Sequence, residues 1–245
     1  MASLREIGPG VFQLRVLGAY VWLLPDEPVT LIDTGTRGSG RALLAALERL
    51  GRRPEELAVV VLTHYHPDHV GGLPDLLARL QARAGAMPRV AIHHAEAPYL
   101  RAPATLPNPV RPALLRALVQ PLWPLVRLRR PCPVHAPLAD GACVPGRPDL
   151  RVVHLPGHTP GSIALYLPAR GVVLAGDALE RRGGRLGPPN PYFTADPVTA
   201  WASLQRLAAL EFDTLALSHW PPIRRGAAAA VRALVTGAEP LTPAG

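Results

Sequence analysis

The sequence predicts an α/β fold in which two mixed β-sheets lie face to face and helices cover their outer sides. In the first third of the chain, β-rich runs broken by Gly and Pro alternate with segments of helical apolar spacing. The same alternation returns in the second half, and the two halves are of similar size. Strands in both halves end in His or Asp, and no short repeat is visible. We therefore expect residues 1–245 to form a single domain.

The first half contains one strand that matters most for function. "LAVVVLTH" (57–64) is short, apolar and β-branched, as a buried strand would be, and its end carries a cluster of histidines. "GRALLAALERL" (40–50) has helical apolar spacing, and Gly51 ends it. The other elements expected here are strands at 10–16, 19–24, 29–35 and 89–94 and a helix over 70–85 closed by Gly85.

The second half predicts a further set of strands and two helices. "DPVTAWASLQRLAAL" (196–210) reads as a helix with Asp196 as its N-cap and Pro197 in its first turn. The last predicted helix is "GAAAAVRALV" (226–235). Strands are expected at 149–159, 162–168, 171–177 and 212–219.

Residues 102–131 depart from this alternation. The region is rich in proline and arginine, and "RPALLRALVQPLWPLVRLRR" predicts two short helices rather than another layer. Two interpretations stay open: structural padding over one edge, or a hydrophobic cap beside a substrate pocket.

Composition excludes several classes. With 48% hydrophobic and 18% charged residues among 245, the chain is globular rather than disordered. All 26 basic residues are arginine, so any mechanism that needs a lysine contact is excluded.

The formal charge of +8 could indicate nucleic acid or anionic lipid as a partner. Between Ala97 and Ala139 there is no acidic residue. We interpret the charge as a solvated surface of an arginine-biased protein, and nucleic acid as an unlikely partner, because no aromatic-interleaved RNA-binding pattern accompanies it. The arginines of this segment are 101, 111, 116, 127, 129 and 130.

Several features predict a cytoplasmic protein. Arg5 and Glu6 interrupt the apolar run that a signal peptide needs, and the apolar stretch 117–126 is too short to span a bilayer. Cys132 and Cys143 are expected to be free thiols in a reducing compartment. If residues 139–141 turn a hairpin, Cys143 would lie opposite Leu138 rather than Cys132, so the hairpin would not pair the two cysteines.

The stretch "THYHPDHVGG" (63–72) has the composition of half a metal site. Residues two apart on a helix point about 200° away from each other, so His64 and His66 could not converge there. In an extended segment, the side chains of residues 64, 66 and 68 point to one side, and a turn over 67–71 would direct His69 to the same side. Imidazole and carboxylate are ligands of zinc-like divalent metals.

One tetrahedral ion cannot easily take all four side chains from so short a run, so two adjacent ions would divide them. The remaining ligands should lie at other strand ends, where a strand gives way to a Gly/Pro-rich loop. The sequence has such residues at His158, Asp177 and His219.

Together "THYHPDHVGG", "PGHTPGS", "AGD", "SHW" and the upstream "LIDTG" resemble the metallo-β-lactamase superfamily of hydrolases, from about residue 10 to 225. The resemblance implies a four-layer αβ/βα sandwich with a dinuclear metal centre at one edge of the sheets. Asp33 would support the site from outside the ligand sphere, which fits the need of a ligating imidazole for an acceptor on its other nitrogen. The implied ligands are His64, His66 and His158 for one ion, Asp68, His69 and His219 for the other, and Asp177 bridging both.

The expected chemistry follows from two divalent ions, with Zn²⁺ as first candidate and Fe or Mn as alternatives. A water shared by two ions loses much of its proton affinity, and the resulting hydroxide would attack an acyl carbonyl that one ion polarises. Asp68 is the hypothesised proton shuttle to the leaving group. Tyr192 and Arg182, in the loop after Asp177, are weaker candidates for contacting substrate. His93, His94, His135 and His154 are assigned structural roles.

We therefore predict a dinuclear metal-dependent hydrolase of a small-molecule ester, thioester or lactone, in the glyoxalase II or lactonase-like branch. The absence of lysine counts against a glyoxalase-II-like thioesterase, and the apolar 110–126 region could hold an acyl chain of a lactone. The alternatives are a non-haem di-iron oxidoreductase on the same ligands, an RNA-processing nuclease, and a non-enzymatic binding module. The substrate and the oligomeric state are not determined at this level.

Overall fold

The computed structural model describes residues 3–83, 87–102, 107–126, 128 and 130–237. A seven-stranded mixed sheet forms the N-terminal half, in the order β1 to β7. Its first four strands pair antiparallel, whereas β4, β5, β6 and β7 pair parallel. The strands are β1 (Leu4–Gly8), β2 (Val11–Arg15), β3 (Tyr20–Leu24), β4 (Val29–Ile32), β5 (Leu57–Leu62), β6 (Arg89–His93) and β7 (Ala136–Leu138).

The second sheet is five-stranded, in the order β14-β11-β10-β9-β8. It is also mixed, because β11 and β14 pair parallel and the other neighbours antiparallel. A separate two-stranded ribbon is formed by β12 (Glu180–Arg182) and β13 (Arg185–Gly187). The strands of the second sheet are β8 (Cys143–Val144), β9 (Arg147–His154), β10 (Ile163–Leu167), β11 (Val172–Leu174) and β14 (Thr214–Ala216).

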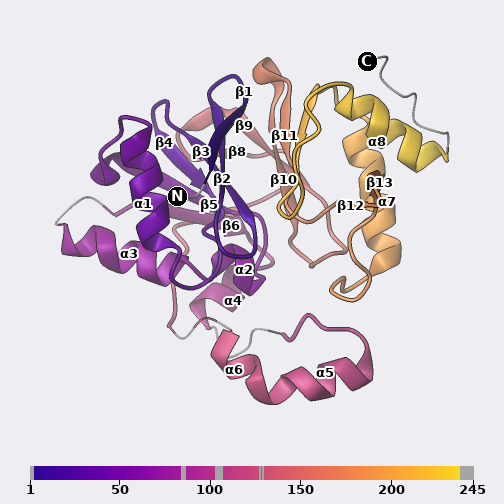
Figure 1. Cartoon of the computed structure of the whole chain (residues 1–245), viewed down its shortest axis with the longest axis horizontal. Coiled ribbons are helices and arrows are strands. Elements are labelled where there is room, and N and C mark those ends of the chain that lie inside the picture. Colours follow the sequence, from indigo (N-terminus) through magenta and orange to yellow (C-terminus); the bar gives the residue numbers. More distant parts are fainter. Residues whose placement is uncertain (1–2, 84–86, 103–106, 127, 129, 238–245) are drawn as a thin grey trace.

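Helices lie on the outer sides of both sheets, as Figure 1 shows. α1 and α3 cover the first sheet, and α7 and α8 cover the second. Asp196 caps α7 by accepting the N–H groups of Val198 and Thr199, as the sequence predicts. The helices are α1 (Gly40–Arg49), α2 (Pro67–Val70), α3 (Leu73–Ala82), α4 (Ala97–Arg101), α5 (Ala113–Val119), α6 (Trp123–Val126), α7 (Pro197–Ala208) and α8 (Ala227–Thr236), with 3-10 turns η1 (Pro54–Glu56), η3 (Gln120–Leu122) and η4 (Pro168–Arg170).

Three hydrophobic clusters correspond to the three interfaces of a four-layer sandwich. Leu43 and Leu76 of α1 and α3 pack with strand residues of the first sheet. Trp22, fully buried, belongs to the cluster between the two sheets. Leu204 and Val231 of α7 and α8 pack on the second sheet. The predicted αβ/βα sandwich with two mixed sheets is confirmed.

The helix expected over 70–85 is confirmed as α3, which begins at Leu73 rather than Val70, because Val70 ends the separate short helix α2; Gly85 lies outside the described residues. Residues 139–141 do not form a hairpin between neighbouring strands, since β7 belongs to the first sheet and β8 to the second. Both cysteines are nonetheless free thiols, as expected.

Within the region 102–131, the helices α5 and α6 project from the sandwich (Figure 1). The described part of this region contains α5, η3 and α6, which confirms the two short helices and no further layer; residues 103–106, 127 and 129 lie outside the described residues. Figure 1 places this segment, hereafter the cap (residues 107–126), below both sheets. Among the helices of the described part of the chain, none has the length and apolarity to cross a bilayer.

Candidate metal centre

The residues predicted as ligands meet at one edge of the two sheets. His64 and His66 directly follow β5, and Asp177 follows β11. His158 lies in the loop between β9 and β10, and His219 follows β14. The carboxyl ends of parallel strands point to one edge, so residues far apart in the sequence are brought together.

The first group consists of His64, His66, His158 and Asp177. His158 Nε2 lies 3.0 Å from His66 Nδ1 and 3.6 Å from Asp177 Oδ2. His64 Nε2 lies 3.9 Å from the same carboxylate oxygen. Ligand atoms of a tetrahedral zinc-like ion are separated by about 3.3 Å, because each lies about 2.0–2.1 Å from the metal. The group therefore has the spacing of a divalent metal site.

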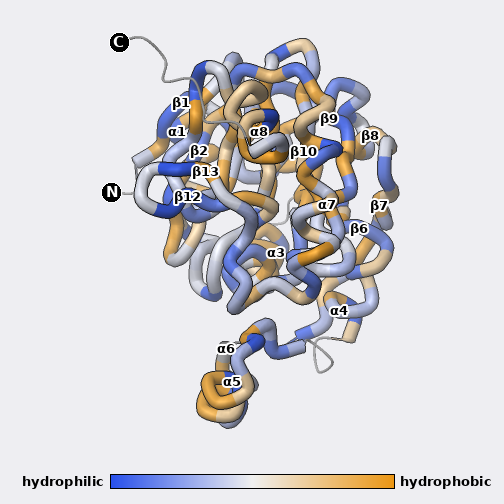
Figure 2. Tube along the Cα trace, turned by 90° about the vertical axis from the view of Figure 1, so that its right-hand side faces the viewer, coloured by the Kyte–Doolittle hydropathy of each residue, from blue (hydrophilic) through white to orange (hydrophobic). Residues whose placement is uncertain are grey.

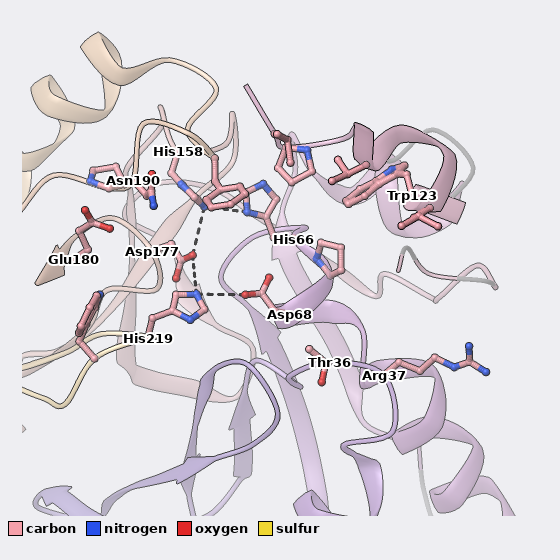
Figure 3. A pocket seen from close by; sticks show the side chains of 18 of the residues that line it. Thr36, Arg37, His66, Asp68, Trp123, His158, Asp177, Glu180, Asn190 and His219 are labelled. Atoms are coloured by element: carbon pink, nitrogen blue, oxygen red, sulfur yellow. Dashed lines mark hydrogen bonds and ion pairs between the residues drawn. The ribbon is translucent and has the colours of Figure 1, made fainter. Parts of the chain in front are cut away.

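The second group consists of Asp68, His69 and His219. His219 Nε2 lies 3.3 Å from Asp68 Oδ2, and His69 Nε2 lies 3.8 Å from it. Asp177 faces this group as well: its Oδ1 lies 3.4 Å from His69 Nε2 and its Oδ2 lies 3.2 Å from His219 Nε2. Asp177 thus stands between the two groups, as Figure 3 shows for His158 and His219.

Orphaned polar atoms indicate that these residues suit a cation. His64 Nε2, His69 Nε2 and Asp177 Oδ1 are buried without a hydrogen-bond partner. An unpaired buried polar atom costs about 1–3 kcal/mol, so three of them in one place need a ligand to satisfy them. Divalent ions held by the two groups would do so: one beside His64, one beside His69, and Asp177 facing both.

The other nitrogen of four of these imidazoles is held by a neighbour; for His64 it is the hydroxyl of Thr63, 3.1 Å from Nδ1. Asp33 Oδ2 lies 2.8 Å from His69 Nδ1, with both side chains fully buried. His219 Nδ1 lies 2.9 Å from the carbonyl oxygen of Gly18, and His158 Nδ1 lies 3.3 Å from Thr194 Oγ1. Such contacts fix the ring orientation and the tautomer. They leave Nε2 of each of these rings directed into the site.

Burial and the neighbouring charges set the protonation states. Burial and the adjacent imidazoles hold the pKa of His64 and His66 well below 6.5, and burial lowers that of His158 to about 4. Burial opposes ionisation of Asp177, but His69 and His219 outweigh it and hold its pKa well below 3.8. At neutral pH His64, His66 and His158 are therefore neutral imidazoles and Asp177 is a carboxylate, the forms that bind metal. Burial opposes protonation of His69 and His219, but Asp177 and the other nearby carboxylates outweigh it and raise the pKa of both above 6.5, so a metal ion would displace a proton from these two rings.

Close backbone approach explains the two glycines that end the motif. A Cβ on Gly72 would lie 2.1 Å from the carbonyl oxygen of Thr34, although the φ of Gly72 is an ordinary −77°. A Cβ on Gly71 would lie 2.9 Å from the backbone nitrogen of Arg37. The glycines thus let the start of α3 pack against the loop that carries Asp33.

A cavity of about 770 Å³ opens beside the metal-binding groups. Its volume is within the range of small-molecule sites. In Figure 3 the ligand side chains lie between Trp123 of the cap on one side and Glu180 and Asn190 on the other. Most of its remaining lining is apolar: Pro109, Val110, Val119, Leu122, Leu125, Leu179, Phe193 and Trp220.

The two weaker substrate candidates lie elsewhere. Tyr192 and Arg182 are not among the residues that line the cavity; Tyr192 is 58% exposed, and Arg182 pairs with Glu180. Phe193, the residue after Tyr192, is the aromatic residue of that loop that lines the cavity. The sequence shows an aromatic loop here but not which of its rings turns inward.

The remaining histidines have packing partners outside the site. His93 stacks on His154 with ring centroids 4.0 Å apart and lies 4.2 Å from His94, while His135 accepts the backbone N–H of Val90. Burial lowers the pKa of His93 to about 4. These contacts are those of structural residues.

Sequence reasoning missed the support of the His158 loop. The fully buried carboxylate of Glu96 accepts the hydroxyl of Thr159 and, at 2.9 Å, the N–H of Gly161. Burial raises the pKa of Glu96 to about 7. No motif signals Glu96, because it lies about sixty positions before the loop that it holds.

The model of the metallo-β-lactamase superfamily matches residues 14–219, which include all seven residues of the two groups. The chain belongs to the metallo-β-lactamase superfamily. It is 34% identical over 238 residues to a probable metallo-hydrolase, YflN, of Bacillus subtilis, covering 89% of this chain and 86% of that protein. The expectation of a hydrolase of this superfamily is thereby confirmed.

Two further comparisons bear on chemistry. This chain is 33% identical over 199 residues to a hydroxyacylglutathione hydrolase of Aeromonas hydrophila, and the match covers 80% of this chain but 58% of that protein. The chain thus matches little more than half the length of that enzyme. A solved structure, TTHA1623 in a di-iron-bound form, is similar with a TM-score of 0.62 and 30% identity, covering 86% of this chain and 91% of that one.

Proposed function

We propose that the protein is a dinuclear metal-dependent hydrolase that cleaves a small-molecule ester, thioester or lactone with an apolar acyl part. The observation that carries this is the position of Asp177, whose carboxylate faces both ligand groups at 3.2 to 3.6 Å from His158, His69 and His219. We propose His64, His66 and His158 as ligands of one ion, Asp68, His69 and His219 of the other, and Asp177 as the bridge. Zn²⁺ is the first candidate, with iron and manganese as alternatives.

Two bound divalent ions would acidify a shared water and polarise the acyl carbonyl. The protein's own residues hold this arrangement rigidly. Asp33 and the carbonyl of Gly18 orient His69 and His219, and Glu96 holds the backbone next to His158. The site is buried except on the side of Asp68 and His219, which are each 34% exposed. Substrate and protons would therefore enter from that side.

Asp68 is placed to move a proton. Its Oδ2 faces His219 and His69, and its side chain lines the cavity. A carboxylate with one oxygen bound to metal keeps the other for a proton, so we propose Asp68 as the shuttle to the leaving group.

The lining of the cavity supports the substrate class. Trp123, Phe193 and Trp220 offer aromatic surface to an acyl group, while Arg37 is the cation of the lining. The hydroxyacylglutathione hydrolase relatives favour a thioester, and the apolar lining favours a lactone or ester with an acyl chain. We further propose that residues 1–245 are a single domain in a reducing, cytoplasmic setting, which the two free cysteines support.

The test is a panel of ester, thioester, lactone, β-lactam and phosphodiester substrates with metal-loaded protein. We expect turnover of one of the first three, and a loss of at least about a hundredfold in His66→Ala. Activity on the phosphodiester alone would replace this proposal by a nuclease.

A second candidate function is a non-haem di-iron oxidoreductase, favoured by the di-iron form of the structurally similar protein. Metal analysis and an electronic spectrum of protein purified without added metal distinguish the two. Two zinc ions per chain support the hydrolase, whereas two iron ions with oxygen-dependent turnover support the oxidoreductase.

A further inference from the structure

The cap carries an exposed apolar surface that extends beyond the cavity. Leu114 is 87% exposed and Leu118 is 73% exposed, and no residue of α5 is buried. Leu122 and Leu125 continue the row at helical spacing and are each 59% exposed. Figure 2 shows this apolar segment standing clear of the body of the molecule. An exposed leucine row of this extent indicates a surface that meets a partner.

The charge of this segment is of one sign. No acidic residue occurs between Ala97 and Ala139. Two exposed arginines lie at α5: Arg111 precedes the helix, and Arg116 belongs to it. A short helix that combines exposed leucines with arginines, and lacks acids, has the composition of helices that lie in the interface of an anionic bilayer.

The exposed row is continuous with the cavity. Leu122 and Leu125 are at once largely exposed and part of the cavity lining, and the buried Trp123 lies between them. A surface that covered Leu114 and Leu118 would therefore lie next to the part of the cavity lining that Leu122 and Leu125 form.

We propose that the cap docks the protein onto the surface of an anionic lipid bilayer, with the leucines of α5 and η3 inserted among the lipids and the arginines at the headgroups. A second copy of this chain fits less well, because two such faces would bring arginines together with no acid between them. Nucleic acid fits less well too, since exposed leucines gain nothing from a phosphate backbone. This docking does not depend on the reaction proposed above.

The experiment measures binding of the metal-loaded full chain to vesicles by co-sedimentation. Vesicles of phosphatidylcholine are compared with vesicles that also contain phosphatidylglycerol. We expect binding to the anionic vesicles that weakens with salt. Leu114→Glu/Leu118→Glu should lower the partition coefficient by about a hundredfold, since each inserted leucine contributes about tenfold.

Two matched variants separate the contributions. Arg111→Gln/Arg116→Gln should bind anionic vesicles about 25-fold more weakly, at about fivefold per arginine, and lose part of the salt dependence. Val198→Glu changes a residue of α7 that is 80% exposed and outside the cap, and should bind like the unchanged protein. Circular dichroism and thermal unfolding of all variants show whether they fold alike.

Three outcomes overturn the proposal: no binding of the unchanged protein to anionic vesicles, equal binding of the leucine variant, or equal loss in Val198→Glu. Light scattering supplies a fourth. The unchanged protein could prove to be a dimer that does not bind vesicles and that Leu114→Glu/Leu118→Glu dissociates. In that case the cap is an interface between two copies of the chain. The experiment measures binding and not turnover. A protein that does not bind vesicles therefore leaves the hydrolase proposal intact, and a protein without hydrolase activity can still bind vesicles.

Discussion

Asp33 Oδ2 lies 2.8 Å from Nδ1 of His69, and neither side chain is accessible to solvent. The same aspartate accepts the backbone N–H and the hydroxyl of Thr63, each at 2.8 Å, so its orientation is fixed from two sides. Asp33 has a φ of +59°, in the left-handed region that non-glycine residues rarely adopt. The loop after β4 thus holds a strained residue whose carboxylate aims one imidazole into the site.

Asp33→Asn tests this relationship. The amide has one accepting oxygen in place of two, so it cannot accept from both Thr63 and His69 as the carboxylate does. His69 then loses its fixed tautomer, and we expect affinity for one of the metals to fall by about 10- to 100-fold. Chelator competition followed by metal analysis measures it. Glu211→Gln, at an exposed carboxylate, is the control. Unchanged affinity in Asp33→Asn would show that His69 does not need this partner.

Asp177→Asn tests the bridge. The amide keeps the size of the side chain but removes the charge that faces both groups, so we expect bound metal to fall from two ions per chain to one or fewer. Metal content is measured after dialysis against metal-free buffer. Retention of both ions would exclude the bridging role.

Asp68→Asn tests the proton shuttle. In protein reloaded to full metal content, we expect turnover to fall by about 10²- to 10⁴-fold, the usual contribution of a positioned proton carrier. A substrate with a leaving group that needs no proton should recover much of the loss. Near-normal turnover with full metal would refute the role.

Gly72→Ala tests the close approach of α3 to the loop after β4. The new methyl group would lie 2.1 Å from the carbonyl oxygen of Thr34, so we expect the free energy of unfolding to fall by about 3 kcal/mol or more. Gly187→Ala is the control, because a Cβ there meets nothing within 4 Å and its φ is not positive. Urea unfolding measures both, and equal midpoints would contradict the packing argument.

An ion-pair cluster away from the site predicts the response to acid. The almost fully buried Arg147 lies 2.7 Å from Asp149 and 3.1 Å from Asp26. Its hydrogen bond lowers the pKa of Asp149 below 3.8; burial opposes ionisation of Asp26, but Arg170 and Arg147 outweigh it and lower its pKa as well. Because the folded pKa values lie below the unfolded ones, this stability is present above about pH 4 and is lost as pH falls further.

Arg147→Met should therefore lower the free energy of unfolding at pH 7 and flatten its decline toward pH 3. Both carboxylates are partly exposed, so we expect a loss of about 1–2 kcal/mol at pH 7. Arg53→Met, which removes an exposed pair with Glu56, is the control and should change little. A variant that declines with acid as steeply as the unchanged protein would disprove the assignment.

The sequence predicted much of the metal centre because its ligands follow strands that local pattern reveals. The β-branched run of β5 ends just before His64, and the Gly/Pro-rich loops after three other strands hold His158, Asp177 and His219. The cap was predicted as two short helices, but two interpretations of it remained, because proline and leucine content does not tell which side faces a cavity.

By itself, the sequence determined the layers, the family and the seven side chains that converge, since periodicity and motif spacing are local properties of the chain. Only the tertiary structure decided which atoms face one another. Phe193 rather than Tyr192 lines the cavity, Glu96 holds a loop about sixty residues away, and Gly72 is needed for space rather than for its φ. Those outcomes depend on packing between segments distant in the chain, where one side chain's direction is set by neighbours that no local pattern specifies.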